Sequence, residues 1–287
     1  MRLSGLALLP LLPAAVGCAG AVSSPGADGV DAESSTTSAL VSVERTSDPA
    51  TGSRAETSAR FLRVVAPSSA DDALRAIGAS LELPAAGTCA AIAARAGSGP
   101  TQLPMVELLD VGGVTLEVGG LETRLSPRQL PDVTDVVSGV VYARGTDPGL
   151  LPDSARYVVR VTGTPGFEPF AVSALGAGDP AQVRIAGEDE TGTLVATGSV
   201  LDVSWPADSD DVVYVDVRPA GVRCTLGDES GNSTPGVGAH ATVSTLLLDD
   251  AGTVVVHRLH REPLRAPSVD SGEIRFDFAR SVPYVRR

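Results

Sequence analysis

Short apolar segments separated by glycine and proline turns dominate the sequence from residue 104 onward. Gly-Gly pairs at 112–113 and 119–120 divide three of these segments. Short apolar runs with turn residues between them are typical of an all-β sandwich or barrel. We therefore predict strands at 61–65, 106–109, 114–118, 121–125, 136–143, 157–162, 170–175, 201–205, 212–217, 241–248, 253–260 and 273–279. The turn residues Asp249-Asp250-Ala251-Gly252 predict that 241–248 and 253–260 form a hairpin.

Two of these segments alternate strictly between apolar and polar residues, as expected for strands with one face in a core. Arg275 and Asp277 should therefore lie on the face opposite to the apolar residues of their strand. Tyr214 is expected in the core. The predicted inward-facing residues are Leu201, Val203, Trp205, Ile274, Phe276 and Phe278.

One segment has the pattern of a helix. Ser68 or Ser69 can cap its amino terminus, and Asp71 and Asp72 follow in the first turn, where they interact favourably with the helix dipole. Apolar residues then recur at spacings of three and four, up to Pro84 at the latest. The sequence predicts one short helix whose apolar face carries Leu74, Ile77 and Leu81.

The segment from Leu150 to Val161 resembles the tyrosine-corner region of fibronectin type III and related sandwiches. That resemblance implies that Tyr157 hydrogen-bonds to the chain just upstream. Pro180–Arg218 also resembles fibronectin type III, through a proline-led strand, a strand ending in Trp205-Pro206 and a strand containing Tyr214. We therefore expect two β-sandwich domains of fibronectin III or immunoglobulin-like type, at 59–175 and 176–287.

The first 17 residues have the pattern of a secretory signal peptide, with a positive charge at Arg2, an apolar core and small residues before Cys18. Ala15-Val16-Gly17-Cys18 resembles the lipobox of bacterial lipoproteins, which implies a lipid on Cys18. In envelopes with two membranes, Ala19 resembles the pattern of lipoproteins sent to the outer one. The alternative is cleavage after Ala19-Gly20-Ala21, which would leave a soluble, secreted protein.

Residues 18–58 are rich in small and polar residues and show no helix or strand period. Such a composition buries too little apolar surface to offset the entropy of ordering. The sequence therefore predicts a disordered stalk between a lipid on Cys18 and a folded body.

The formal net charge is -13, and all 22 basic residues are arginines. An acidic surface repels phosphate backbones, so nucleic acid is not expected as a partner. The absence of lysine from the sequence excludes a phosphate-binding loop with Gly-Lys, a Ser-x-x-Lys nucleophile and a Schiff-base lysine.

Three cysteines are present, and lipidation of Cys18 would leave Cys89 and Cys224. An exported protein meets an oxidising environment in which two thiols often pair. Cys224 also alternates with Val222 and Leu226, which fits a small buried apolar residue. The sequence leaves both interpretations open, the Cys89–Cys224 disulfide and a buried thiol.

Metal sites have little support in the sequence. His257 and His260 are three residues apart, so on a strand they point to opposite faces and cannot share a metal ion. Asp208, Asp210 and Asp211 share one loop and are candidate calcium ligands, but no complete calcium motif surrounds them. No cofactor is expected.

No complete catalytic motif is found, because Gly227–Gly231 has its serine one place too late for Gly-x-Ser-x-Gly. We therefore expect a membrane-anchored envelope lipoprotein, not an enzyme, that binds or scaffolds envelope proteins through strand edges or end loops. The alternative is a calcium- or glycan-binding surface receptor that uses the acidic end loops.

Overall fold

The computed structural model describes residues 35–65, 68–92, 106–130, 137–206, 210–227 and 238–287. The predicted signal peptide, Cys18 and Asp208 lie outside these residues. Ser34–Arg287 forms one compact unit, to which everything below refers.

The fold is all-β with one α-helix in the described chain, as the sequence predicts. In the first half, the elements are β1 Ser35–Ser47, β2 Arg54–Val65, α1 Ala70–Ala76, β3 Thr88–Ala91, β4 Val106–Leu108, β5 Val114–Val118, β6 Leu121–Arg124, β7 Ser126–Leu130, β8 Val137–Thr146, β9 Arg156–Val161 and β10 Phe170–Leu175. In the second half, they are β11 Arg184–Ile185, β12 Leu194–Ala196, β13 Val200–Trp205, β14 Val212–Arg218, β15 Val222–Thr225, β16 Ala239–Ser244, β17 Ala251–Pro263 and β18 Ser271–Arg286.

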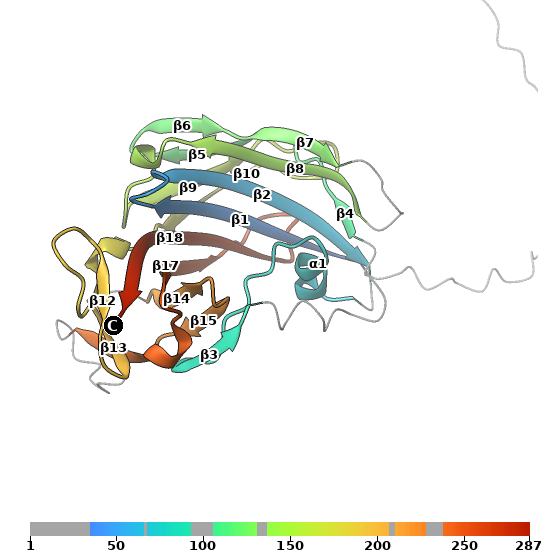
Figure 1. Cartoon of the computed structure of the whole chain (residues 1–287). Coiled ribbons are helices and arrows are strands. Elements are labelled where there is room, and N and C mark those ends of the chain that lie inside the picture. Colours follow the sequence, from blue (N-terminus) through green and yellow to red (C-terminus); the bar gives the residue numbers. More distant parts are fainter. Residues whose placement is uncertain (1–34, 66–67, 93–105, 131–136, 207–209, 228–237) are drawn as a thin grey trace, which may run out of the picture. The chain divides into compact units, whose positions relative to one another are not determined.

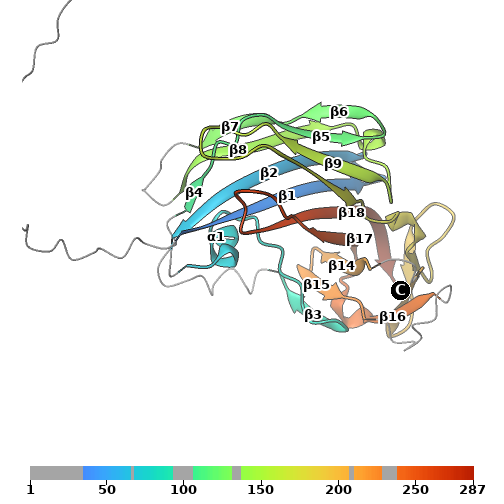
Figure 2. The ribbon, with the colours of Figure 1, turned by 180° about the vertical axis from the view of Figure 1, so that it is seen from behind.

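The strands form three sheets. The largest has 11 strands in the order β3-β15-β14-β17-β18-β1-β2-β4-β8-β7, with β12 beside β18. A four-stranded sheet has the order β10-β9-β5-β6, and a three-stranded sheet has the order β11-β13-β16. Figures 1 and 2 show β2, β1, β18 and β17 side by side in the middle of the large sheet.

Both small sheets pack on the same face of the large sheet. The four-stranded sheet contributes Leu116 and Val159 to one hydrophobic core, with Phe276 from β18. The three-stranded sheet contributes Val203 to a second core, with Val282, also from β18. Residues 276 and 282 are an even number apart and so lie on one face of that strand. The two cores are thus sandwiches that share the long strands of one sheet.

The division into two cores can be compared with the two domains predicted from the sequence. The first core draws mainly on residues before Ala177 and the second on residues after Val183, close to the predicted boundary at 176. The large sheet nevertheless continues across that boundary, because β18 pairs in parallel with β1 and antiparallel with β17.

The stalk predicted at 18–58 is wrong from residue 35 onward. Residues 35–47 and 54–58 lie in β1 and β2, in the centre of the large sheet. The composition of β1 is misleading because only one of its faces is apolar, through Ala39, Val41 and Val43. Its other face carries Ser42 and Glu44, and that side of the sheet is polar.

The helix is shorter than predicted. Ser69 caps it, with its side chain accepting from Asp72 N and its backbone N–H donating to the Asp72 carboxylate. The helix ends before Gly78, which has a φ of +67°, so Leu81 lies beyond it. Ala73, Leu74 and Ile77 cover β2 and β4 at one end of the polar face.

Two further predictions about the second half have different outcomes. Strand β13 buries Leu201, Val203 and Trp205 and exposes Asp202 and Ser204, as predicted. The predicted hairpin across 249–252 is wrong, because the strand before it (β16) pairs with β13 and the strand after it (β17) pairs with β14 and β18. A 3₁₀ turn at Thr245–Leu247 carries the chain from one sheet to the other.

The predicted tyrosine corner is present. Tyr157 has no exposed surface, and its hydroxyl donates to the carbonyl oxygen of Pro152 at 2.7 Å. Its ring stands 4.8 Å from that of Phe276, measured between centroids. Burial raises the pKa of the Tyr157 phenol, so the hydroxyl stays protonated and donating at any ordinary pH.

Replacement of Tyr157 by Phe should lower the free energy of unfolding by about 0.5–1.5 kcal/mol, because it removes the hydrogen bond that the buried Tyr157 donates to the Pro152 carbonyl oxygen. Urea denaturation of wild type and Tyr157→Phe measures this difference. An unchanged midpoint would show that the hydrogen bond does not stabilise the corner.

Candidate functional site

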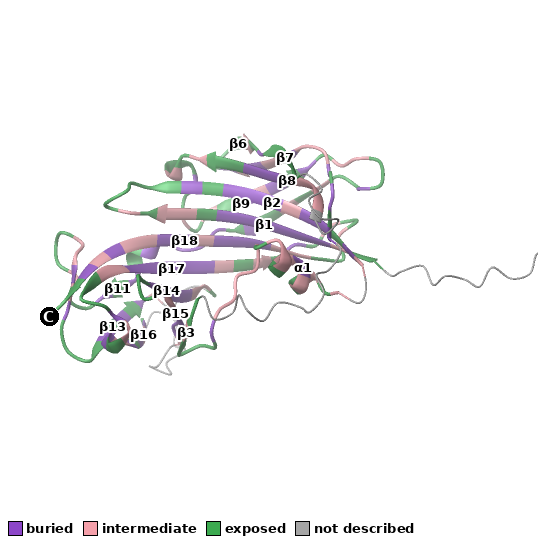
Figure 3. Cartoon of the chain, turned by 45° about the vertical axis from the view of Figure 1, so that its right-hand side comes forward, coloured by how far each residue is buried: buried purple, intermediate pink, exposed green. Residues whose placement is uncertain are grey.

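The face of the large sheet that lies away from the small sheets is polar in its middle strands. Ser42 and Glu44 from β1, Asp216 from β14 and Asp277 from β18 are among the side chains on this face. They line a cleft of about 510 Å³ that the 78–81 segment borders on one side. In Figure 3 the central strands β1, β17 and β18 are mostly buried along their middle. Because these strands are buried along their middle, the polar side chains that they carry into the cleft have fixed positions.

Three side chains on three neighbouring strands form the centre of the cleft. Tyr214 donates its hydroxyl to Asp277 Oδ2 at 2.6 Å, and His257 Nδ1 lies 2.8 Å from Asp277 Oδ1. The rings of Tyr214 and His257 stack with centroids 4.1 Å apart. Their position follows from strand register, since Tyr214 is directly opposite His257 in the β14–β17 pair.

A second carboxylate closes the other side of this cluster. Asp216 accepts two hydrogen bonds from Arg223, Nε to Oδ1 at 2.7 Å and Nη2 to Oδ2 at 2.8 Å. The guanidinium carbon of Arg223 lies 4.9 Å from the centroid of the Tyr214 ring. His257 Nε2 is buried 3.9 Å from Asp216 Oδ2 and has no hydrogen-bond partner among the described residues. The imidazole is thus enclosed between two carboxylates.

The electrostatics of the cluster favour an ionised Asp277. Burial acts to raise the pKa of Asp277, but His257, Tyr214 and Arg223 outweigh it and hold the pKa below its usual range. Burial and the Asp277 charge raise the pKa of Tyr214, which keeps that hydroxyl protonated and donating.

Glu44 and Arg60 differ from these paired groups. Burial raises the pKa of Glu44, and the neighbouring carboxylates Asp277 and Glu56 raise it further. Burial lowers the pKa of Arg60, and Glu44 and Glu56 partly offset that effect. Arg60 is half-buried, Glu44 is exposed to the cleft, and the two lie on neighbouring strands of the same polar face.

The chemical capacity of this cluster follows from its geometry. An imidazole oriented by a carboxylate is a general base only if Nε2 reaches a reacting group. No described hydroxyl or thiol lies within hydrogen-bonding distance of His257 Nε2. The described residues therefore do not supply a nucleophile that His257 could activate.

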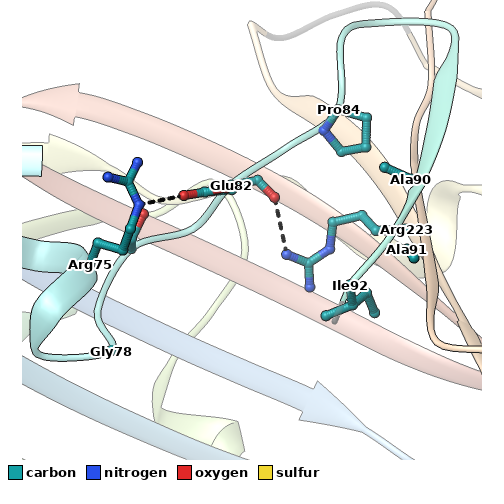
Figure 4. A pocket seen from close by; sticks show the side chains of 9 residues that line it. Arg75, Gly78, Glu82, Pro84, Ala90, Ala91, Ile92 and Arg223 are labelled. Atoms are coloured by element: carbon teal, nitrogen blue, oxygen red, sulfur yellow. Dashed lines mark hydrogen bonds and ion pairs between the residues drawn. The ribbon is translucent and has the colours of Figure 1, made fainter. Parts of the chain in front are cut away.

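A smaller pocket of about 210 Å³ adjoins the cleft, between the segment after α1 and β3 (Figure 4). Arg75 Nε donates to Glu82 Oε1 at 2.8 Å, and Arg223 Nη1 donates to the carbonyl oxygen of Glu82 at 3.4 Å. Arg223 lines both cavities, so this segment is tied to the Asp216 side of the cluster.

Cys89 and Cys224 form a disulfide in the structure, with their sulfur atoms 2.03 Å apart. They lie directly opposite each other in the antiparallel pair of β3 and β15. Cys224 is also buried in the second hydrophobic core with Leu226, but as half of a disulfide and not as a free thiol. The disulfide joins chain from before and after the predicted domain boundary.

The loop predicted to bind calcium does not present Asp211 as a calcium ligand. Asp210 is exposed, and Asp208 lies outside the described residues. Asp211 is buried, and its carboxylate pairs with Arg258 at 3.0 Å and His260 at 3.0 Å and accepts from Gly178 N at 2.8 Å. Both oxygens have partners, so Asp211 is not available to a calcium ion. No group of three or more His, Cys, Asp or Glu that could hold a metal is found among the described residues.

His257 and His260 lie on opposite faces of β17, as predicted, because the register with β18 runs without a break. They are not the exposed polar residues that a surface strand would carry. Burial acts to lower the pKa of His260, but Asp211 and Glu262 outweigh it and raise the pKa above its usual value.

Most residues of the cleft were not predicted as a site. Glu44, Tyr214, His257 and Asp277 come from four strands spread over more than 230 residues of sequence. The alternation that places Arg275 and Asp277 away from the core of β18 is the one sequence feature that pointed to this face.

Comparisons with known proteins leave the family of this chain open. No family model and no curated protein matches the chain. Among solved structures, the chain is similar to the Fcho1 Mu homology domain of Danio rerio with bound Eps15 peptide, at 11% sequence identity over 88% of this chain and 97% of that chain. The TM-score of 0.22 is too low to support any argument.

Proposed function

We propose that this chain is a non-catalytic binding protein of a bacterial cell envelope, tethered to a membrane by a lipid on Cys18, and that its ligand binds in the polar cleft. The observation that carries the proposal is the open cleft on the uncovered face of the large sheet. Charged groups gathered in a concave, partly buried place are costly to the fold, and such places are common at binding sites.

The enclosed position of His257 supports binding over catalysis. A general base must reach the proton that it removes, whereas His257 Nε2 is buried beside Asp216. In the proposal, Tyr214, His257, Asp216 and Asp277 form a rigid floor for the cleft and do not react.

The proposed location of the protein in the cell envelope is based on the sequence. The lipobox resemblance at Cys18 and the Ala19 that follows it favour the outer membrane of a two-membrane envelope, and a secreted soluble form is the alternative. None of the helices in the described chain is long and apolar enough to cross a membrane.

Fatty-acid labelling of the expressed full chain tests the anchor. We expect the wild type to carry label and to sediment with membranes, and Cys18→Ser to do neither. Ala19→Ser is the matched control and should keep the label. Equal labelling of wild type and Cys18→Ser, or label on neither, would contradict the anchor, and the second result would favour the secreted form.

An envelope protein partner at a strand edge is a second candidate. Strand β10 ends the four-stranded sheet, and its Leu175 is 47% exposed beside that edge. A free edge can accept a strand from another protein. In this case a photoreactive residue at position 173 should give one discrete crosslinked species in intact cells. The same residue at position 160, exposed on the inner strand β9, should not.

A further inference from the structure

We propose that the cleft binds a small zwitterion, a molecule with a primary ammonium and a carboxylate a few atoms apart, with the ammonium at Glu44 and the carboxylate at Arg60. This inference rests on the proposed function, because it names the ligand class of the same cleft. Amino acids are the simplest molecules with this chemistry.

Glu44 is the acidic residue to which we assign the ammonium. In the β1 register it stands between two other acids, opposite Asp277 of β18 and Glu56 of β2. Like charges directly opposite each other on neighbouring strands are destabilising. Glu44 has no hydrogen bond or ion pair to any described residue. A carboxylate that lines a cleft between two other acids is stabilised when a cation binds to it.

Arg60 is the basic residue to which we assign the carboxylate. Its Nη1 donates to Ser58 Oγ at 3.1 Å, and the guanidinium forms no ion pair with a described carboxylate. A guanidinium carries five donors in a planar fork that suits a carboxylate. Arg60 therefore keeps donors free for an anionic group, on the polar face that also carries Glu44.

The other buried charges of the cleft already have partners. Asp277 is bound by His257 and Tyr214, and Asp216 is bound by Arg223. Arg275 donates through Nε to Glu273 at 2.7 Å. Among the described residues of the cleft, the charged side chains without an ion pair are Glu44, Asp48, Arg54, Arg60 and Arg218. Asp48 accepts hydrogen bonds from Ala50 N and Thr51 N, and Arg54 and Arg218 are exposed at strand ends. Glu44 and Arg60 are therefore the acid and the base that lie within a strand and have no ion pair.

The spacing of these two residues suits one small molecule. Arg60 is paired with Leu40, four residues before Glu44 on β1, which separates the two backbones by about 14 Å along the strand. The Arg60 side chain turns toward Ser58 and so toward Glu44. Two long side chains reaching toward each other leave room for a ligand of a few atoms. A ligand with a single charge would satisfy only one of them.

Isothermal titration of the soluble Cys18→Ser chain tests the inference. The probes are glycine, β-alanine and γ-aminobutyrate, which carry both charges at increasing separation, with ethylamine and propionate as single-charge controls. We expect at least one zwitterion to bind at least tenfold more tightly than both controls. Binding of a single-charge control as tightly as the best zwitterion would overturn the inference.

Two substitutions test whether the ligand binds at Glu44 and Arg60. Glu44→Gln and Arg60→Gln should each weaken the bound zwitterion at least tenfold, while their circular dichroism stays that of the parent. The matched controls are Glu107→Gln and Arg63→Gln, exposed residues on β4 and β2 that lie outside the cleft, and they should change binding less than twofold.

Three results separate the inference from the proposed function. Zwitterion binding that survives both cleft substitutions overturns the inference. Failure of all three zwitterions also overturns it. If a ligand of another class then binds and loses affinity in Glu44→Gln or Arg60→Gln, the proposed function stands and only the ligand class is wrong.

Discussion

Removal of the Cys89–Cys224 disulfide should lower the free energy of unfolding by about 3–5 kcal/mol. The bond closes a loop of 135 residues in sequence, and a link over so long a loop removes much entropy from the unfolded chain. It also holds a four-residue strand, β3, whose residues are mostly exposed and which pairs, among the described strands, with β15 alone. Few other contacts hold β3 in place.

Urea denaturation of the Cys18→Ser chain, with and without reductant, measures this effect. Cys89→Ala combined with Cys224→Ala should match the reduced protein and should not respond to reductant. A midpoint that reductant leaves unchanged in the Cys18→Ser chain would mean that the disulfide does not form or does not stabilise the fold.

Replacement of Asp211 by Asn should also cost about 3–5 kcal/mol of unfolding free energy. Arg258 is 1% exposed and lies 3.0 Å from Asp211 through its Nε. Loss of the negative charge removes the Asp211 carboxylate from beside a buried guanidinium, which is far more costly than loss of an exposed pair. The Gly178 N–H would also lose a charged acceptor.

Asp210→Asn is the matched control, since Asp210 is the exposed neighbour in the same loop, and it should change stability by less than about 0.5 kcal/mol. In Asp211→Asn the pKa of His260 should fall, because its raised value depends first on Asp211. Thermal denaturation and NMR titration of the histidines measure the two effects. Equal stability of the two variants would contradict the buried ion pair.

The fold class and several local features could be predicted from the sequence. Tyr157 forms its corner, and Trp205 packs on the predicted face, because both depend on residues close in sequence. The sequence could not show that β1 and β2 are central strands. Their polar alternate positions resemble those of a linker unless the polar face of the sheet is known.

The candidate site was harder to predict for a related reason. The site forms because β14, β17 and β18 are neighbours in the sheet, which brings together Tyr214, His257 and Asp277. Strand order cannot be predicted from local sequence patterns. The predicted hairpin at 249–252 was wrong for the same reason, since β16 pairs in another sheet. Alternation identifies which residues share a face of a strand, but it does not identify the neighbouring strand.

The most direct test of the account is an NMR titration of the ¹⁵N-labelled Cys18→Ser chain with the tightest-binding zwitterion. The account predicts saturable shifts of amides in β1, β2 and the 78–81 segment, centred on Glu44 and Arg60, and their loss in Glu44→Gln. Shifts confined to the 210–211 loop or to the β10 edge, with the cleft unchanged, would contradict the claim that the polar face of the large sheet is the binding site.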